Sequence, residues 1–174
     1  MRVAVLATGG KDSTLALYHV LSEGNEVKCL AAVISKREDS WMFHFPNIRL
    51  TDLFAEAVEL PLVKAESSGI KEKELEDLEH LVEVLDVEGV VSGAIASTYQ
   101  KTRIDEICKK LGLVSVTPLW QKNPLDILNE ILTLKFEVII TGVYAYGLGK
   151  DWLGRRIDEN ALVDLVELNR KYGV

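Results

Sequence analysis

Short apolar runs rich in β-branched residues alternate along this chain with longer segments of helical periodicity, and this alternation restricts the fold most. The apolar runs cover residues 3–7, 27–34, 62–65, 89–93, 114–117 and 137–142. The segments with helical spacing cover residues 12–23, 47–60, 70–85, 97–111, 124–134 and 159–172. Continuous apolar runs are typical of strands that are buried on both faces of a sheet. The alternation therefore predicts an α/β fold, a doubly wound and mainly parallel sheet with helices on both faces.

Length and charge set the broad class. The 174 residues suit a single domain over 1–174 that can bury its own core, and no stretch approaches a membrane span. The net charge of −7 argues against a protein that binds nucleic acid mainly through contacts with the phosphate backbone. The N-terminal apolar run is too short for a signal peptide, so a cytoplasmic location is expected. A homo-oligomer is an open alternative.

A glycine-rich turn follows the first apolar run, and a helical segment begins at once. The turn reads Thr8-Gly9-Gly10-Lys11-Asp12-Ser13-Thr14. Glycines let the backbone turn sharply and approach a ligand closely, and the first amides of a helix lack internal partners. The macrodipole adds positive character there, Lys11 can meet a phosphate oxygen, and the hydroxyls of Ser13 and Thr14 can donate to others. Asp12 fits a Mg²⁺ ligand or a helix cap. The pattern thus indicates a nucleotide phosphate site.

Two alternatives stand beside that interpretation. The spacing is neither that of the Walker loop nor GxGxxG. A tight turn between strand and helix, with Ser13 or Asp12 only as a cap, would also explain the bare glycine pair. The lysine, acid and hydroxyls that follow the glycines favour nucleotide binding.

Residues 8–14 resemble the SGGKDS-type pyrophosphate loop of the N-type ATP pyrophosphatases, with Thr8 in place of the usual serine. Four further stretches resemble the diphthine–ammonia ligase family within that superfamily. They are a segment like S-x-M-[FY]-H at residues 39–44, a block like GxIxSxYQxxR at residues 89–103, Pro118-Leu119-Trp120, and a GL…LG stretch at residues 147–155.

This resemblance implies an adenine nucleotide alpha hydrolase-like fold and an AMP-forming ligase that uses ATP and Mg²⁺. Its implied substrates are diphthine, a modified histidine on translation elongation factor 2, and ammonia. ATP would adenylate the diphthine carboxylate, and ammonia would then displace AMP. The family also carries a GEGGEYET-type motif beyond a segment like residues 169–174, which this sequence does not contain, so we expect a missing C-terminal family segment.

The resemblance and the topology together predict the site residues. Ligands of doubly wound sheets bind beyond the carboxyl ends of the strands. We expect the nucleotide to meet residues 8–14 together with Ile34, Ser35, Ser92, Gly93, Ala94 and Ser97. Lys11, Asp12, Gln100 and Arg103 are the expected catalytic residues, with Asp12 as the metal ligand. The expected substrate-binding residues are His44, Tyr99, Gln100, Arg103 and Trp120.

Simpler interpretations remain for several of these residues. Ser97 alone would be read as an N-cap, and Arg103 as the surface partner of Asp105 or Glu106. Tyr99 and Trp120 could each pack the core. Cys29 and Cys108 read as small buried hydrophobes, which counts against a sulfur-transfer enzyme.

Two rival functions also remain. One is another N-type ATP pyrophosphatase, such as an enzyme that modifies tRNA. The other is a nucleotide-binding regulatory module without turnover, in which the polar residues at 97–103 would have no task.

Overall fold

The computed structural model describes residues 1–35, 50–70 and 73–173, and it divides the chain into two compact units, Met1–Gln121 and Lys122–Val174. The expectation that residues 1–174 act as a single domain stays a prediction. In the described part of the chain, no helix combines the length and the apolar character that crossing a bilayer requires.

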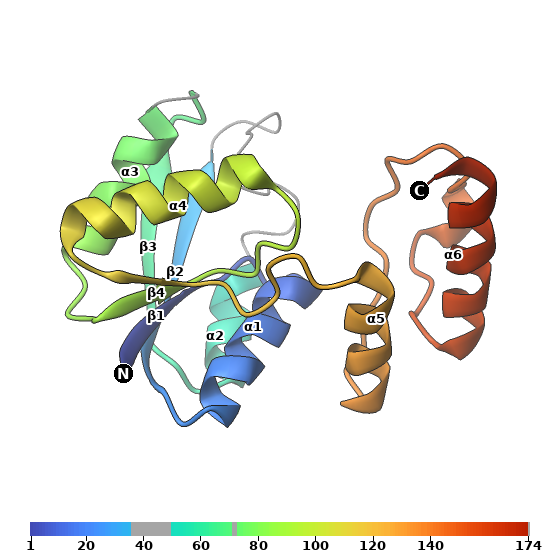
Figure 1. Ribbon diagram of the computed structural model, residues 1–174, viewed down its shortest axis with the longest axis horizontal. Coiled ribbons are helices and arrows are strands. Elements are labelled where there is room, and N and C mark those ends of the chain that lie inside the picture. Colours follow the sequence, from blue (N-terminus) through green and yellow to red (C-terminus); the bar gives the residue numbers. More distant parts are fainter. Residues whose placement is uncertain (36–49, 71–72, 174) are drawn as a thin grey trace. The chain divides into compact units, whose positions relative to one another are not determined.

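The first unit is built on a five-stranded sheet in the order β3-β2-β1-β4-β5 (Figure 1). The strands are β1 (Arg2–Leu6), β2 (Glu26–Ser35), β3 (Leu62–Ser67), β4 (Gly89–Val91) and β5 (Val114–Val116). Every pairing is parallel, with Val3 opposite Val27 and Gly89, Leu30 opposite Leu62, and Gly89 opposite Val114. This confirms the predicted doubly wound parallel sheet.

Helices cover both faces of this sheet. Figure 1 shows α3 (Lys73–Glu83) and α4 (Thr98–Leu111) on one face, and α1 (Lys11–Ser22) and α2 (Thr51–Ala57) on the other. Right-handed crossovers explain the split, because the chain winds outward from β1 to β3 and then returns to place β4 on the other side of β1. The switch in direction therefore lies between β1 and β4, so the loops after these two strands leave toward opposite faces.

The core is apolar on both sides of the sheet. Val3, Ala4 and Val5 of β1 are all completely buried, as a central parallel strand requires. Under α3 and α4 the core cluster consists of Ala31, Val33, Leu78, Leu81, Val82, Val90, Ile104, Ile107 and Cys108.

The second unit holds α5 (Pro124–Thr133), the 3-10 turn η2 (Lys150–Trp152) and α6 (Glu159–Tyr172). The side chains of Asn123 and Asp158 cap α5 and α6, accepting hydrogen bonds from Leu125 N at 2.9 Å and Ala161 N at 2.7 Å. In the GL…LG stretch, the guanidinium of Arg155 lies 4.2 Å from the ring centroid of the buried Trp152. The GL…LG stretch therefore contributes to the packing inside the second unit.

One predicted strand is wrong. Residues 137–142 form no strand, and their only pairing among described residues is an isolated antiparallel bridge between Ile139 and Arg156. Ile139 is 55% exposed, so the run is not the buried strand that its composition suggested.

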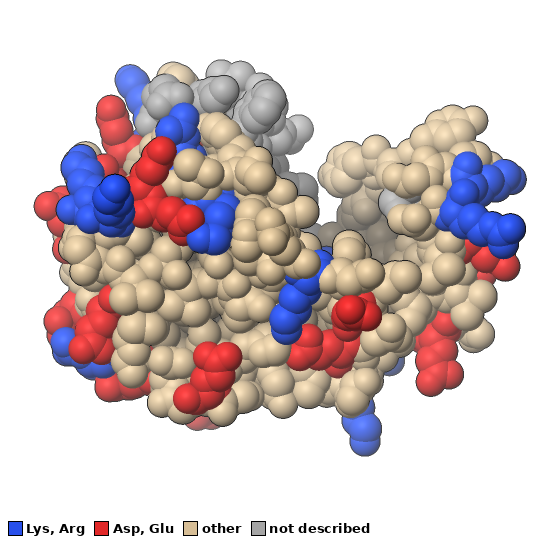
Figure 2. All heavy atoms as spheres, in the orientation of Figure 1, with Lys and Arg blue, Asp and Glu red and all other residues tan. Residues whose placement is uncertain are grey.

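Charge is mixed on the molecular surface. Figure 2 shows acidic and basic side chains interspersed on the face drawn, with uncharged surface between them. This distribution agrees with the acidic balance of the whole chain, whose net charge is −7.

Candidate functional site

Buried polar side chains gather at one edge of the sheet. Each one lies at the carboxyl end of a strand or in the first turn of the helix that follows: Ser13, Ser35, Thr51, Ser67, Glu74 and Ser92. Buried polar groups cost free energy unless they are hydrogen-bonded, so such a concentration is typical of a functional edge rather than of a packing core. The doubly wound topology places a ligand site at the same edge.

The turn between β1 and α1 is shaped by glycine and held by hydroxyl groups. Gly9 has a φ of 70°, in the left-handed region that glycine tolerates best. The Ser13 hydroxyl donates to Gly10 O at 3.0 Å and accepts from Thr8 N at 3.3 Å. The hydroxyl oxygens of Thr8 and Ser13 lie 3.2 Å apart, and Thr14 Oγ1 donates to Gly10 O at 3.0 Å. Three predicted hydroxyls therefore brace the loop itself.

The start of α1 carries no side-chain cap. Gly10 is the N-cap residue and makes no capping hydrogen bond, which differs from the caps of α4, α5 and α6. The simple interpretation of Ser13 or Asp12 as the cap is therefore wrong. An uncapped helix start presents amide donors and partial positive charge, which suits an anion.

Lys11 and Asp12 pair with each other at this helix start. Lys11 Nζ lies 2.7 Å and 2.8 Å from the two carboxylate oxygens of Asp12, and about a third of each side chain is exposed. Among the described residues, no group of three or more histidine, cysteine, aspartate or glutamate side chains forms a metal centre. The assignment of Asp12 as a Mg²⁺ ligand stays a prediction.

The loop after β4 closes against this helix start. A Cβ atom on Gly93 would lie 2.7 Å from Asp12 C and 2.8 Å from Ser13 N, so only glycine permits the approach. The missing side chain of Gly93 makes room for the backbone of α1, and the expected contact of Gly93 with a nucleotide stays a prediction. Ala94 beside it is buried.

Ser92 supplies a polar group without a protein partner. Its side chain is 4% exposed, and its hydroxyl has no hydrogen-bond partner among the described atoms. Because Ser92 immediately precedes Gly93, this hydroxyl lies beside the loop that meets the start of α1. A buried hydroxyl of this kind fits a ligand that completes its hydrogen bond. The residues present therefore fit a nucleotide.

The start of α4 combines a cap with cationic side chains. Ser97 accepts a hydrogen bond from Gln100 N at 3.3 Å, so its role as an N-cap is confirmed. Arg103 donates to Glu106 at 3.0 Å and lies 5.6 Å from the ring centroid of Tyr99, which itself packs against the core cluster. The first turn of α4 contains no acidic residue.

The turn after β5 joins the same edge. Trp120 N donates to Thr117 O at 3.1 Å, and Gln121 N donates to Ile95 O at 2.8 Å. Leu119 is completely buried, while Trp120 is half-buried. The Pro-Leu-Trp turn is therefore tied to the loop after β4, which brings Trp120 to the predicted edge.

Two other predicted residues lie at the end of β2. Ser35 is buried and Ile34 is half-buried, and both pair with β3 through Glu66 and Ser67. His44, together with the motif at residues 39–44, lies outside the described residues.

Both thiols are buried. Burial raises the pKa of Cys108 to about 11, and it raises the pKa of Cys29 as well, with Lys28 opposing the rise. Thiols with raised pKa values are poor nucleophiles at neutral pH. This confirms that both cysteines are small buried residues, and neither lies at the carboxyl edge.

Sequence reasoning did not single out Lys101, and it named Asp105 only as a possible surface partner of Arg103. Lys101 Nζ lies 2.5 Å and 2.6 Å from the two oxygens of Asp105, and 5.9 Å from the ring centroid of Trp120. The i, i+4 spacing of the two charges was visible in the sequence, but the contact with Trp120 depends on the fold.

Comparison with known proteins covers both units. The family model described as the diphthamide synthase N-terminal domain matches residues 1–115, and the one described as the diphthamide synthase C-terminal domain matches residues 123–174. The diphthine–ammonia ligase of Rattus norvegicus is 36% identical over 197 residues, which span 100% of this chain and 73% of the relative. The diphthine–ammonia ligase of Homo sapiens is 35% identical over the same shares, and that of Saccharomyces cerevisiae is 28% identical, with 31% of its length covered.

Solved structures support the fold. A predicted subunit of tRNA methyltransferase from Methanocaldococcus jannaschii matches 99% of this chain and 89% of its own, with a TM-score of 0.56 and 16% identity. The U34-tRNA thiolase of Methanococcus maripaludis matches 98% of this chain and 66% of its own, with a TM-score of 0.52 and 14% identity. At such identities the likeness shows the architecture alone.

Proposed function

Because the chain belongs to the diphthamide synthase family, we propose that it is an ATP-dependent diphthine–ammonia ligase that forms the amide of diphthine on elongation factor 2. The structural observation that carries the proposal is the uncapped start of α1, which lies against the loop of the unpartnered Ser92 hydroxyl. In the proposal this pair of features binds the polyphosphate of ATP.

Amide formation needs an activated carboxylate, because an oxide ion is a very poor leaving group. ATP supplies the AMP that turns the carboxylate oxygen into a good leaving group, and pyrophosphate is released in that step. Ammonia then attacks the carbonyl carbon and AMP departs. The negative charge that builds on the departing pyrophosphate must be stabilised by donors already in place.

The first helical turn of α1 provides such donors. In the proposal the amides at Lys11, Asp12 and Ser13 point at the phosphates, and glycine at positions 9 and 10 lets the polyphosphate approach. Lys11 then exchanges its ion pair with Asp12 for a phosphate oxygen. Asp12, once released, is free to hold Mg²⁺, which would neutralise further phosphate charge.

The start of α4 offers a second electropositive site for the substrate carboxylate. The first turn of α4 carries no acidic residue, and Arg103 follows in the second turn. Arg103 is about one-third exposed, so its bond to Glu106 can be exchanged for a carboxylate, which the planar guanidinium binds with two parallel donors. Gln100, one turn earlier, is proposed to orient that carboxylate, and Tyr99 and Trp120 are proposed to line its pocket.

The proposal assigns both units to one reaction, with translation elongation factor 2 and ammonia as the partners and the cytoplasm as the location. Relatives named diphthine–ammonia ligase match across both units, which supports treating residues 1–174 as one working part. A tRNA substrate has weaker support, because the resemblance to tRNA enzymes rests on 14–16% identity and the net charge is −7.

The test is a product assay with purified protein, ATP, Mg²⁺, ammonium and elongation factor 2 that carries diphthine. The proposal expects AMP and pyrophosphate, formed only when the diphthine-bearing factor is present, and expects the factor to gain an amide by mass spectrometry. Matched reactions contain the factor from a diphthamide-deficient source, or bulk tRNA. Formation of ADP, AMP formation driven by tRNA, or the absence of turnover with the diphthine-bearing factor would contradict the proposal.

A further inference from the structure

Lys101 occupies a position that helix stability does not explain. It lies in the first turn of α4, where the helix macrodipole disfavours a cation. Its partner Asp105 follows it by four residues, which is the less favourable order for such a pair. The Lys101 side chain is only 20% exposed, although lysine usually keeps its ammonium group in water. A residue whose placement opposes the local preferences of a helix in this way is expected to have a role in the functional site.

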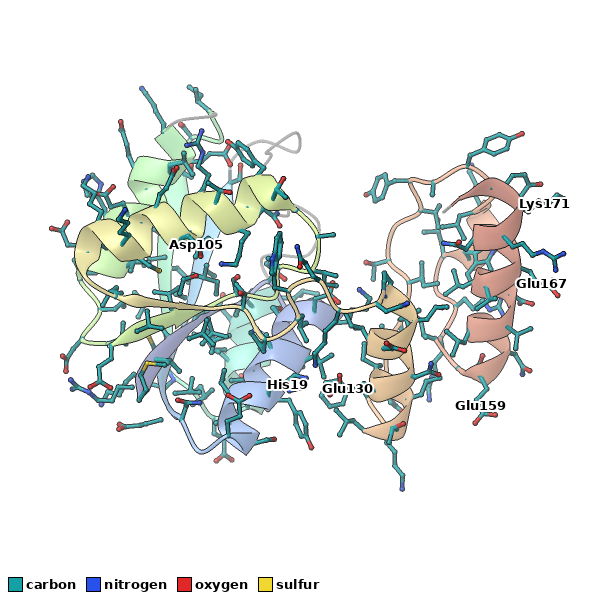
Figure 3. The ribbon with its side chains drawn as sticks, in the orientation of Figure 1. His19, Asp105, Glu130, Glu159, Glu167 and Lys171 are labelled. Atoms are coloured by element: carbon teal, nitrogen blue, oxygen red, sulfur yellow. The ribbon has the colours of Figure 1, made fainter. Side chains whose placement is uncertain are left out.

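Asp105 fixes the ammonium group of Lys101. Figure 3 shows Asp105 projecting from α4 on the side of the strands. Burial would raise the pKa of Asp105, but the hydrogen bonds and the positive charge of Lys101 outweigh it and lower the pKa. The carboxylate therefore stays ionised at neutral pH and holds the ammonium at 2.5 Å and 2.6 Å.

The ammonium group held in this way faces the indole of Trp120. Their separation of 5.9 Å lies within the range of a cation–π interaction, and partial burial strengthens such an interaction. The backbone of the Trp120 turn is fixed by hydrogen bonds to Thr117 and Ile95. Those bonds fix where the turn lies but not the plane of the half-buried indole ring, and among the described residues Lys101 places a cation over that ring.

We propose that Lys101, held by Asp105, is a positioning residue that fixes the Trp120 indole as a wall of the pocket for the protein substrate. This inference rests on the proposed function, because it takes the carboxyl edge as the place where the modified side chain of the factor binds. Lys101 acts through Trp120 and not on the reacting atoms.

Fluorine NMR of protein labelled with 5-fluorotryptophan tests the contact without any reaction. The chain has three tryptophans, so three resonances are expected, and Trp120→Phe identifies the relevant one. Lys101→Met removes the cation but keeps the aliphatic length, and it should shift and broaden the Trp120 resonance while that of Trp152 stays in place. Lys101→Arg should restore the signal, because a guanidinium also stacks on indole. Lys110→Met is the matched control, since Lys110 lies on α4 as Lys101 does but pairs with Glu79 of α3.

Steady-state kinetics test the consequence. Lys101→Met should raise the KM for diphthine-bearing factor about tenfold, as expected for the loss of one partly buried cation–π contact, and leave the KM for ATP unchanged. Trp120→Leu should give a similar increase, and the double variant should add little to it. Lys110→Met should behave as the wild type does.

The outcomes separate this inference from the proposed function. An unmoved Trp120 resonance in Lys101→Met, or equal effects of Lys101→Met and Lys110→Met, would overturn the positioning role even in a fully active enzyme. A wild-type KM for Trp120→Leu would overturn it as well. If the wild type forms no AMP with the factor, the proposed function fails, and the substrate-pocket part of the inference fails with it.

Discussion

Replacing Gly93 with alanine should disable the nucleotide site by displacing the start of α1. The added Cβ would lie 2.7 Å from Asp12 C and 2.8 Å from Asp12 O and Ser13 N. The shortest of these distances is about 0.7 Å short of the 3.4 Å at which ordinary contact begins. All three atoms belong to the backbone, so a side-chain rotation cannot relieve the clash. We expect a loss of about 1–3 kcal/mol in the free energy of unfolding, which is typical of an overpacked site.

Gly93→Ala should affect ATP binding and turnover more strongly than it affects stability. A shift of this size at the phosphate donors is expected to weaken ATP·Mg²⁺ binding about tenfold or more and to lower turnover on the order of 10²-fold. At a ligand concentration of 100 times the wild-type Kd, ATP should stabilise the wild type by about 2.7 kcal/mol, and a tenfold weaker variant by about 1.4 kcal/mol. Titration calorimetry gives the Kd, and denaturant unfolding with and without ligand gives the stabilisation.

Gly112→Ala is the matched control for this experiment. Gly112 ends α4 with a φ of 71°, and an added Cβ there would meet no atom within 4 Å. Alanine in the left-handed region costs about 1–2 kcal/mol, so this variant loses stability without moving the start of α1. If Gly93→Ala binds ATP·Mg²⁺ with the wild-type Kd, or if both variants lose affinity equally, the reasoning from the close approach is refuted.

Three further predictions concern single side chains at the edge and in the core. Lys11→Ala and Gly10→Val should each lower pyrophosphate release by about 10²–10³-fold, and near-normal rates in either variant would contradict the phosphate assignment. Ser92→Ala should leave the unfolding free energy of the ligand-free protein unchanged or slightly higher, because it removes a buried hydroxyl without a partner, yet it should weaken ATP binding; calorimetry and denaturant titration check both effects. The buried Cys108 thiol has its pKa raised from 9.0 to about 11, so the native state holds its proton more tightly than the unfolded state does. Its stabilising contribution is therefore full below about pH 9 and is lost as the pH rises toward about 11; unfolding curves across that range should decline more steeply for the wild type than for Cys108→Ala, and parallel declines would refute the effect.

The sheet and the phosphate turn could be predicted because their signals are local. Central parallel strands are buried on both faces, so continuous apolar runs such as residues 3–5 mark them directly. The turn at Gly9 and Gly10 can be recognised in the sequence because a sharp strand-to-helix turn needs glycine. Both features follow from a few consecutive residues.

The run at residues 137–142 shows where local signals fail. Its composition matches that of the true strands, yet it belongs to the second unit, where only Arg156 pairs with it among the described residues. Pairing is decided by partners that are distant in the sequence, and no periodicity in a single run reveals whether they exist.

The detailed contacts of the site could not be predicted from the sequence either. The nucleotide contact expected at Gly93 stays a prediction, and nothing in the sequence indicated that Gly93 also meets the backbone of Asp12 and Ser13, some eighty positions earlier in the chain. In the same way, Lys101 looks like an exposed helix residue until the turn at Trp120 is folded against it.

The central claim is that the amides opening α1 bind the polyphosphate of ATP, and NMR titration tests it most directly. Amide resonances of Gly9 to Ser13 are followed in isotope-labelled protein as ATP with Mg²⁺ is added, and those of α6 in the second unit serve as internal reference. The account predicts large, saturable shifts at Gly9 to Ser13 and at Ser92 and Gly93, with little change in α6. Resonances at α1 that stay unmoved at millimolar nucleotide would contradict it.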